Sequence, residues 1–396
     1  MRHIRLVHIG AAALLVALTA PAAASTAAAA TPPRQASTAG WTQFQYTAAK
    51  TGWNRSERQL TRSNVGSLRQ RWASQPGLAG SPVVVGDRVI SVLNGALVAW
   101  SRDHGHLAWT RPLDGDVNIP PGALAYGDGV VVVTTSTGTE AVRVGSGGVK
   151  WRTTAVAGSR GPTVDGDTVY VGSFDHHVYA LSLRTGAVKW ARATTDEVHS
   201  TIAVSDRTLY VGADNDLVAM STRTGVVRWR TPIGSVFGGG PSVRDGKVYI
   251  AADFQGEGAN QAILYAVRAS TGAVVWQAGL GGDVHAAPSV DATNVYIGII
   301  DDQVFAFDAR TGQQRWVAQV DGEVWAAASI AGGVVYLTID TSQALGLDTR
   351  TGAVLWSTTV TPADFATQTS PAVADGKLYV GYGSGGVRAY APHHEH

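Results

Sequence analysis

Short stretches in which apolar residues alternate with smaller ones recur along this chain, and each ends at a tryptophan. The segment 178–190 reads VYALSLRTGAVKW, and near copies occupy 217–229, 264–276, 304–316 and 344–356. The two-residue period predicts a strand, followed by a break and a second short strand. A glycine at the end of the break is typical of a turn closed by a left-handed residue. Each copy therefore predicts a β-hairpin, with turn glycines at Gly186, Gly225, Gly272, Gly312 and Gly352.

The tryptophans that end these hairpins continue as two less similar copies and one N-terminal strand upstream. They are Trp72, Trp109, Trp151, Trp190, Trp229, Trp276, Trp316 and Trp356. Successive differences of 37, 42, 39, 39, 47, 40 and 40 residues indicate a repeat architecture. Two more strand-like runs lie between each tryptophan and the next hairpin, as in GPTVDGDTVYVGS at 161–173. Each repeat is then four antiparallel strands, which is one propeller blade.

The number of strands predicts how the ring closes. After Trp356 the segment 370–390 supplies three strands and no fourth, whereas the strand ending at Trp72 has no blade of its own. We therefore expect an all-β, eight-bladed propeller in which this N-terminal strand completes the last blade and leaves no open edge at the seam. The repeated tryptophans and turn glycines are expected to be structural, with each indole packed between neighbouring blades.

The ends of the chain differ in composition from the repeats. Residues 1–30 have basic residues, an apolar run from Ile9 to Leu18 and small residues with cleavage sites near Ala24 or Ala30, which is typical of a signal peptide. Residues 31–40 are expected to be a flexible leader remnant, 41–390 the propeller and 391–396 a disordered tail. These features predict an exported, soluble protein without a membrane span.

Composition excludes several classes of function. The 396 residues contain no cysteine, which excludes disulfides, cysteine-ligated metals, a thiol nucleophile and a lipid anchor on cysteine. Without the leader, 29 basic residues face 30 acidic ones and no basic cluster exists, so nucleic acid is not an expected partner. We expect a monomer whose partner is a protein, a small molecule or a glycan.

The hairpin signature of apolar residues, Thr-Gly and a terminal tryptophan resembles the blade motif of the pyrroloquinoline quinone (PQQ) enzyme repeat family. The resemblance covers roughly residues 41–390, and the opening WTQFQYTAAKTGWN followed by LTRSNVGSLRQRW looks like the N-terminal stretch of that family's dehydrogenases and their non-enzymatic relatives. It implies the eight-bladed fold, but many members with this blade bind no quinone. The adjacent cysteines of the alcohol dehydrogenases are absent here, and their calcium ligands and catalytic aspartate match no position of this chain.

Residues that break the repeat lie in the loop after each tryptophan. When the blades are aligned on the second strand, equivalent loop positions hold His199, His285, Trp325 and Gln368, and Gly238 occupies this place in the fifth blade. Two residues earlier come Glu197, Asp283 and Glu323, which share a side with the first set on an extended segment. Arg160 lies one position beyond the equivalent residue of the third blade.

This pattern favours a ligand site at one mouth of the propeller channel. Histidine and carboxylate suit transition metals, and a mixed polar and aromatic cleft suits small molecules. The alternative is a hydrated rim of polar loops that binds nothing specific. Because the two histidines lie two blades apart, joint ligation of one metal ion requires a narrow mouth.

Three hypotheses for function follow. The first is an exported binding or scaffold propeller without catalysis and without a cofactor, favoured by short uniform blades and the lack of an assembled acid and base set. The second is a PQQ- and Ca²⁺-dependent dehydrogenase of an alcohol or sugar, as the resemblance implies. The third is a cofactor-free enzyme on an anionic glycan, with His199 or His285 as the proton-transfer group and Arg160 opposite a substrate carboxylate.

Overall fold

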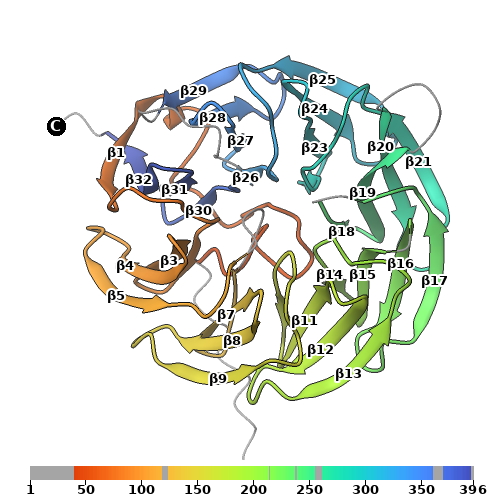
Figure 1. Ribbon diagram of the computed structural model, residues 1–396. Coiled ribbons are helices and arrows are strands. Elements are labelled where there is room, and N and C mark those ends of the chain that lie inside the picture. Colours follow the sequence, from red (N-terminus) through yellow and green to blue (C-terminus); the bar gives the residue numbers. More distant parts are fainter. Residues whose placement is uncertain are drawn as a thin grey trace, which may run out of the picture. The chain divides into compact units, whose positions relative to one another are not determined.

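The computed structural model describes residues 40–117, 124–213, 215–236, 239–254, 261–359 and 369–393. Within the compact unit Ser37–His396 these residues form eight four-stranded antiparallel sheets arranged as a ring (Figure 1). This confirms the predicted all-β, eight-bladed propeller. In the described part of the chain no helix is long and apolar enough to cross a membrane.

The blades are numbered in chain order, and blade 8 combines the last three strands with the first. The innermost strands of blades 1 to 8 are β2 (Val83–Val85), β6 (Leu124–Gly127), β10 (Thr163–Asp165), β14 (Ala203–Ser205), β18 (Ser242–Arg244), β22 (Ser289–Val290), β26 (Ser329–Ala331) and β30 (Ala372–Ala374). The second strands are β3 (Arg88–Leu93), β7 (Val130–Thr135), β11 (Thr168–Ser173), β15 (Thr208–Ala213), β19 (Lys247–Phe254), β23 (Asn294–Gly298), β27 (Val334–Ile339) and β31 (Lys377–Tyr382). The third strands are β4 (Ala96–Ser101), β8 (Gly138–Arg143), β12 (His177–Ser182), β16 (Asp216–Ser221), β20 (Gln261–Arg268), β24 (Gln303–Asp308), β28 (Gln343–Asp348) and β32 (Gly386–Pro392). The outer strands are β5 (Leu107–Pro112), β9 (Val149–Thr153), β13 (Val188–Ala193), β17 (Val227–Pro232), β21 (Val274–Gly279), β25 (Gln314–Gln319), β29 (Val354–Thr359) and β1 (Leu68–Ala73).

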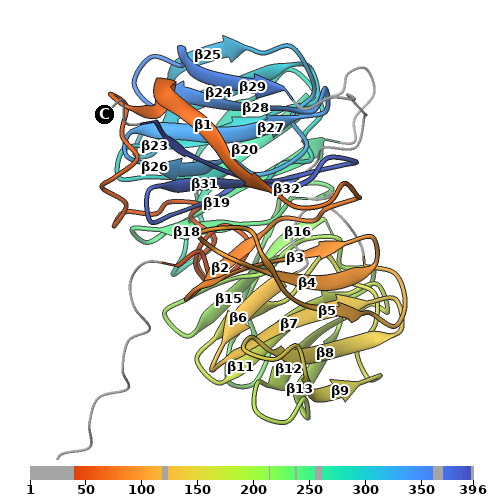
Figure 2. The ribbon, with the colours of Figure 1, turned by 90° about the vertical axis from the view of Figure 1, so that its left-hand side faces the viewer.

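Closure of the ring follows the expected scheme. The strand β1, preceded by the short 3₁₀ helix η1 (Val65–Ser67), pairs antiparallel with β32, from Leu68 opposite Pro392 to Ala73 opposite Arg388 (Figure 2). The N-terminal strand therefore completes blade 8, as predicted. Strand β32 continues to Pro392, two residues beyond the boundary expected from the sequence.

The hydrophobic core lies between neighbouring blades. Most residues of the second strands are apolar, as in VVVVTT of β7, because both faces of these strands are covered by adjacent sheets. All six residues of β7 are buried. One core cluster, for example, joins Tyr170 and Trp190 of blade 3 to Leu209 and Val211 of blade 4.

The repeated tryptophan of one blade packs against the turn glycine of the next blade. The indole of Trp316 in blade 6 packs against Gly352 in the turn of blade 7 and donates its N–H to the Thr349 carbonyl at 3.0 Å. A Cβ at Gly352 would lie 2.7 Å from the indole, and its φ of +74° is left-handed, so this turn requires glycine on two counts. The expected turn glycines all have positive φ, and the tryptophans lie between blades as predicted; Trp109 and Trp229 are half-buried, whereas the other six are buried.

The stretch between Trp41 and the first strand has a role that the repeat pattern did not predict. Residues 41–54, here called the axial segment, cross the centre of the ring and contact the innermost strand of every blade (Figure 1). Their hydrogen bonds, blade by blade, join Trp41 to Val84, Thr42 to Tyr126, Gln43 to Val164, Ala48 to Val204, Ala49 to Val243, Thr51 to Val290, Gly52 to Ile330 and Asn54 to Val373. The axial segment therefore fills the channel at the level of the innermost strands.

Candidate functional site

Three blades present the same short motif ahead of their innermost strand: a carboxylate, a valine and a ring. The motifs are Glu197-Val198-His199 in blade 4, Asp283-Val284-His285 in blade 6 and Glu323-Val324-Trp325 in blade 7. Each central valine is buried, at 0, 3 and 2% exposure, whereas the flanking residues are exposed or half-buried. The carboxylate and the ring therefore share a side, as the two-residue period predicts.

Glycines on the second strands make room for these valines. A Cβ at Gly172 would lie 2.5 Å from Val198, and one at Gly298 would lie 2.2 Å from Val324. Because Val198 and Val324 seat against the bare backbone of Gly172 and Gly298, the motifs of blades 4 and 7 are held at a defined position relative to the neighbouring second strands. The sequence therefore encodes the position of the site through small residues in the strands beside it.

In blade 4 the predicted pair of acid and imidazole makes direct contact. The Nε2 atom of His199 lies 3.1 Å from an oxygen of Glu197. The ring of Phe174, which follows β11 of blade 3, packs against the imidazole with a centroid distance of 5.0 Å. The imidazole is thus oriented by a carboxylate on one side and an aromatic ring on the other.

In blades 6 and 7 the two rings of the motifs pack against each other in a tilted arrangement. The imidazole of His285 and the indole of Trp325 lie 4.5 Å apart between centroids, at an interplanar angle of 41°. The indole N–H donates a hydrogen bond of 2.7 Å to the Glu323 carboxylate two residues earlier. This arrangement holds the Trp325 ring in one orientation and forms the aromatic wall expected from the sequence.

The positive charge of Arg160 acts on both histidines, His199 and His285. Burial is the main cause that lowers the pKa of His199 and of His285, and the Arg160 charge lowers both further. The Glu197 and Asp283 carboxylates oppose these shifts only in part. Burial also lowers the pKa of Arg160 itself. Both imidazoles are therefore neutral at neutral pH, and the arginine is the cation beside them.

Three aspartates that the sequence analysis did not identify accept hydrogen bonds from the backbone of the motifs. The backbone N–H of Asp283 donates to Asp301 at 3.2 Å, that of Glu323 to Asp340 at 3.0 Å, and that of Val284 to Asp253 at 3.4 Å. Burial raises the pKa of Asp253, and the Asp283 charge adds to the effect. All three aspartates lie at or just after the end of a second strand. They follow Val248, Val295 and Val335, the apolar residues on which the blades were aligned, by five or six residues, and this spacing could have indicated them from the sequence.

The axial segment closes the channel beneath the motifs. Phe44 clusters with Ala287 and Ala327, which lie two residues after His285 and Trp325. Phe44 therefore lies at the inner end of the loops that carry His285 and Trp325. Gly238 and Gln368, also predicted as site residues, lie outside the described residues. Within the described residues no group of three His, Asp or Glu side chains is arranged to hold a metal ion, so the metal hypothesis has no support there.

The chain belongs to the family described as outer membrane protein assembly factor BamB, whose profile matches residues 50–142, 122–192, 191–264 and 259–394. This confirms the resemblance to the PQQ-repeat propellers. A search of the curated proteins found no match.

Solved structures with the same fold include a BamB protein and two alcohol-oxidising dehydrogenases. BamB from Moraxella catarrhalis is 20% identical, with 82% of this chain and 99% of that chain covered and a TM-score of 0.66. A europium-containing methanol dehydrogenase is 15% identical, with coverage of 87% and 89% and a TM-score of 0.68. Quinohemoprotein alcohol dehydrogenase from Comamonas testosteroni is 14% identical, with coverage of 89% and 80% and a TM-score of 0.70. At these identities the likeness shows the fold alone.

Proposed function

We propose that this protein is an exported binding propeller without catalysis, and that its channel mouth takes a polyhydroxylated ligand such as the end of a glycan. The observation that carries the proposal is the contact of His285 with Trp325, with the charges of Arg160 and Asp283 acting on the imidazole and the Glu323 carboxylate on the indole N–H. The signal peptide expected over residues 1–30 supports export. The family description, an assembly factor, is consistent with a binding role.

The donor and acceptor set of the mouth matches hydroxyl groups. A sugar hydroxyl both donates and accepts hydrogen bonds, and the mouth offers carboxylates that only accept, a guanidinium that only donates and neutral imidazoles that do both. The Trp325 face adds an apolar platform, which suits the C–H face of a sugar ring. Binding sites of this kind combine aromatic surface with a few fixed polar groups.

The same groups offer no protonated imidazole as a general acid at neutral pH. Low imidazole pKa values keep His199 and His285 unprotonated at neutral pH, so neither is an efficient general acid there. The carboxylates of Glu197 and Glu323 already interact with His199 and with the Trp325 N–H, respectively. This set supports recognition better than the glycan-cleaving enzyme considered from the sequence.

The residues of the mouth fit PQQ with Ca²⁺ poorly. Calcium takes six to eight oxygen ligands, and the described residues offer no cluster of three acidic or histidine side chains for a metal. PQQ is itself a tricarboxylate, whereas the named mouth residues set one arginine against the carboxylates Glu197, Asp283 and Glu323. Like charges would face each other, so we derive no reaction step through this cofactor.

Calorimetric titration with neutral monosaccharides, disaccharides and uronic acids tests the proposal. We expect at least one neutral saccharide to bind, with Trp325→Ala and Arg160→Met each weakening it about tenfold or more because a stacking face or a charged donor is lost. His106→Ala is the matched control, because this exposed histidine lies in the blade 1 turn and should leave affinity unchanged.

Two outcomes would contradict this function. Absence of saccharide binding at millimolar concentration would remove the ligand class. Dye-linked oxidation of an alcohol after addition of PQQ and Ca²⁺, lost in the same mouth variants, would favour the dehydrogenase hypothesis instead.

A further inference from the structure

Seven of the eight repeated tryptophans donate their indole N–H to a backbone carbonyl of the next blade. The donor and acceptor pairs are Trp72 and Arg102, Trp109 and Val144, Trp151 and Leu183, Trp190 and Thr222, Trp229 and Ala269, Trp276 and Ala309, and Trp316 and Thr349, at 2.8 to 3.3 Å. Each acceptor lies just ahead of the hairpin turn that packs on the indole. The turn therefore supplies both a carbonyl and a covering surface.

Trp356 in blade 7 lacks such a turn. Its neighbour is blade 8, where the third and outer strands come from opposite ends of the chain and no hairpin joins β32 to β1. Tyr390 packs edge-on against the indole instead, with centroids 5.3 Å apart at 68°. Among the described residues the Trp356 N–H makes no hydrogen bond, although the side chain is buried.

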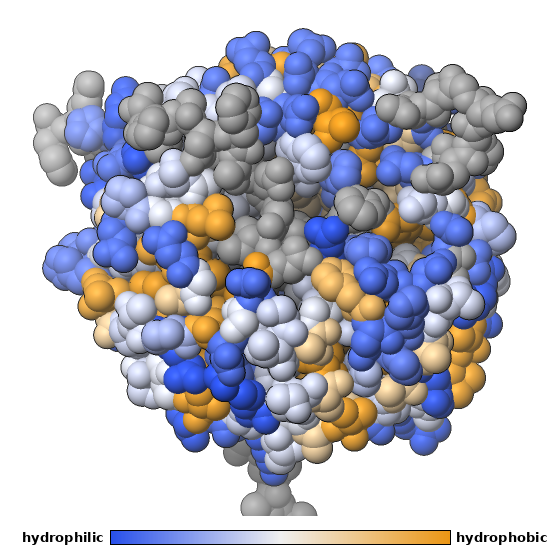
Figure 3. Space-filling view, viewed as in Figure 1, coloured by the Kyte–Doolittle hydropathy of each residue, from blue (hydrophilic) through white to orange (hydrophobic). Residues whose placement is uncertain are grey.

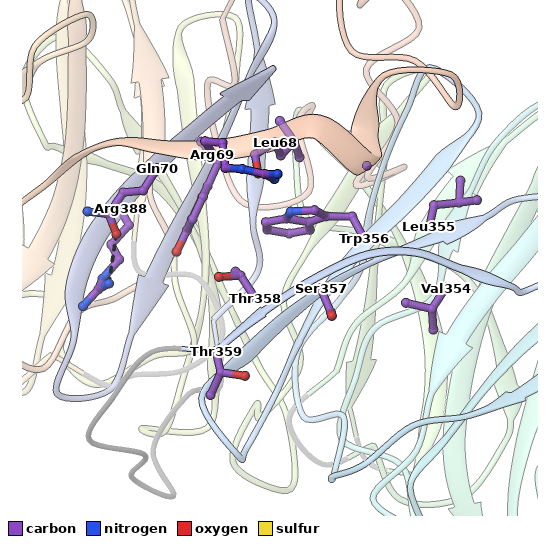
Figure 4. A pocket seen from close by; sticks show the side chains of 12 residues that line it. Leu68, Arg69, Gln70, Val354, Leu355, Trp356, Ser357, Thr358, Thr359 and Arg388 are labelled. Carbon is purple, nitrogen blue, oxygen red and sulfur yellow. Dashed lines mark hydrogen bonds between the residues drawn. The ribbon is translucent and has the colours of Figure 1, made fainter. Parts of the chain in front are cut away.

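A groove occupies the place of the missing turn. It lies between β29 on one side and β1 with β32 on the other, and has a volume of about 560 Å³ (Figure 4). Trp356 lies within it beneath β1, and Ser357, Thr358 and Thr359 continue along the β29 wall (Figure 4). We call this the seam groove. It exists because strand closure replaces a hairpin with two chain ends.

The charged residues of the seam groove are both cations. Arg69 and Arg388 line it, and no carboxylate does among the described residues of its wall. Arg388 donates to the Gln70 side chain at 2.9 Å, and Arg69 donates to the Leu68 carbonyl at 2.9 Å. Each guanidinium has five N–H donors in a planar fork, so both retain donors for a further acceptor.

We propose that the seam groove is a docking site for a turn or short extended segment of a partner protein that carries an acidic side chain. A backbone carbonyl of that segment accepts the Trp356 N–H, as a carbonyl of the next blade does for the other seven tryptophans. Its carboxylate pairs with Arg69 or Arg388. The occupant thus replaces the turn that the seam lacks, at a site separate from the channel mouth.

Hydropathy across one face of the ring does not offer a competing docking surface. In the coloured part of Figure 3, hydrophilic and hydrophobic residues are interspersed around the blades without one broad apolar area. A partner that recognised this face would need many scattered contacts. The seam groove instead combines an indole N–H that has no partner among the described residues, two cations and a concave shape in one place.

A synthetic peptide that copies an internal turn tests the proposal. The probe is the fluorescein-labelled segment 344–353, ALGLDTRTGA, with Arg350→Glu, and a scrambled peptide of the same composition is the control. We expect the probe to bind by fluorescence anisotropy. Trp356→Phe, which keeps a ring but removes the N–H, should weaken binding about fivefold, and Arg69→Gln with Arg388→Gln about tenfold or more.

Trp316→Phe is the matched control variant, because it removes an N–H that already has an acceptor. It should lower the melting temperature and leave peptide affinity unchanged, whereas Trp356→Phe should change affinity with little effect on melting. Equal melting losses in both variants would show that the Trp356 N–H is already satisfied and would overturn the proposal. So would absence of probe binding at millimolar concentration, equal affinity for the scrambled peptide, or displacement by inorganic phosphate as effective as by unlabelled probe.

Discussion

Replacing Lys50 by methionine should stabilise the ring at neutral pH. Lys50 belongs to the axial segment and is 1% exposed. Its Nζ donates to the Phe44 carbonyl at 3.3 Å and lies 5.6 Å from the centroid of the Phe44 ring. Burial lowers the pKa of this amine from 10.5 to about 7. The folded state therefore holds a group that favours the uncharged form.

The magnitude follows from that pKa difference. A shift of this size corresponds to roughly 4–5 kcal/mol of unfolding free energy when the amine is fully protonated. Methionine keeps the apolar stem and loses one hydrogen bond, which offsets about 1 kcal/mol, and the contact with the Phe44 ring, which offsets about 0.5–1 kcal/mol. We therefore expect Lys50→Met to raise the free energy of unfolding at pH 7 by about 2–3 kcal/mol.

The sign is fixed by proton linkage. Between pH 7 and 10.5 the unfolded chain binds a proton at Lys50 that the folded chain does not, so stability rises with pH in this window. Below pH 7 both states are protonated and the penalty is constant. Unfolding in urea, followed by tryptophan fluorescence, should show that the free energy of unfolding of the wild type rises by roughly 2–3 kcal/mol from pH 7 to pH 9 because of this group. The Lys50→Met variant should lack this rise.

Lys189→Met, on an exposed lysine that pairs with Asp167 at 2.9 Å, serves as the matched control and should leave the pH dependence unchanged. The reasoning fails if Lys50→Met retains the wild-type rise between pH 7 and 9. It also fails if the variant is less stable than the wild type at pH 7.

Three further outcomes can be checked with the same purified protein. Deleting residues 41–54 should lower the urea midpoint sharply, because the segment bonds to every innermost strand, whereas a shorter deletion that ends ahead of it should leave the midpoint unchanged. Gly352→Ala should destabilise by about 2 kcal/mol or more in urea titrations, since a Cβ there would lie 2.7 Å from Trp316 at a positive φ; an unchanged midpoint would refute the need for glycine. Because the pKa values of His199 and His285 are lowered in the folded state, their contribution to the free energy of unfolding should be lost as the pH falls below about 6.5. Titration of the imidazole NMR signals should give midpoints below this value. Midpoints above it would contradict the burial of the two imidazoles.

The repeat made much of the architecture predictable. A period near forty residues with a tryptophan at each end is a long-range signal, and an error in one blade is corrected by the others. The same alignment placed Glu197, His199, Asp283 and His285 at equivalent positions, and in the structure Glu197 contacts His199. Constant spacing identifies equivalent residues because each of these loops connects the outer strand of one blade to the innermost strand of the next.

Features without a counterpart in the other blades escaped sequence reasoning. The axial segment has no repeat, so nothing in its sequence indicates that Lys50 and Phe44 lie at the centre of the ring. The supporting aspartates at 253, 301 and 340 follow second strands, but only the fold shows that they accept hydrogen bonds from the site backbone.

By itself the sequence determined the strand pattern, the eight blades, the closing strand and the residues that vary at one mouth, because all of these depend on local periodicity repeated along the chain. Only the tertiary structure decided which of those residues meet. His285 of blade 6 contacts Trp325 of blade 7. Arg160 of blade 3 lowers the pKa of the imidazoles of blades 4 and 6, since closing the ring brings together loops that are far apart in the chain. Closure also leaves Trp356 as the one repeated tryptophan without an acceptor among the described residues, because its neighbouring blade is built from the two ends of the chain.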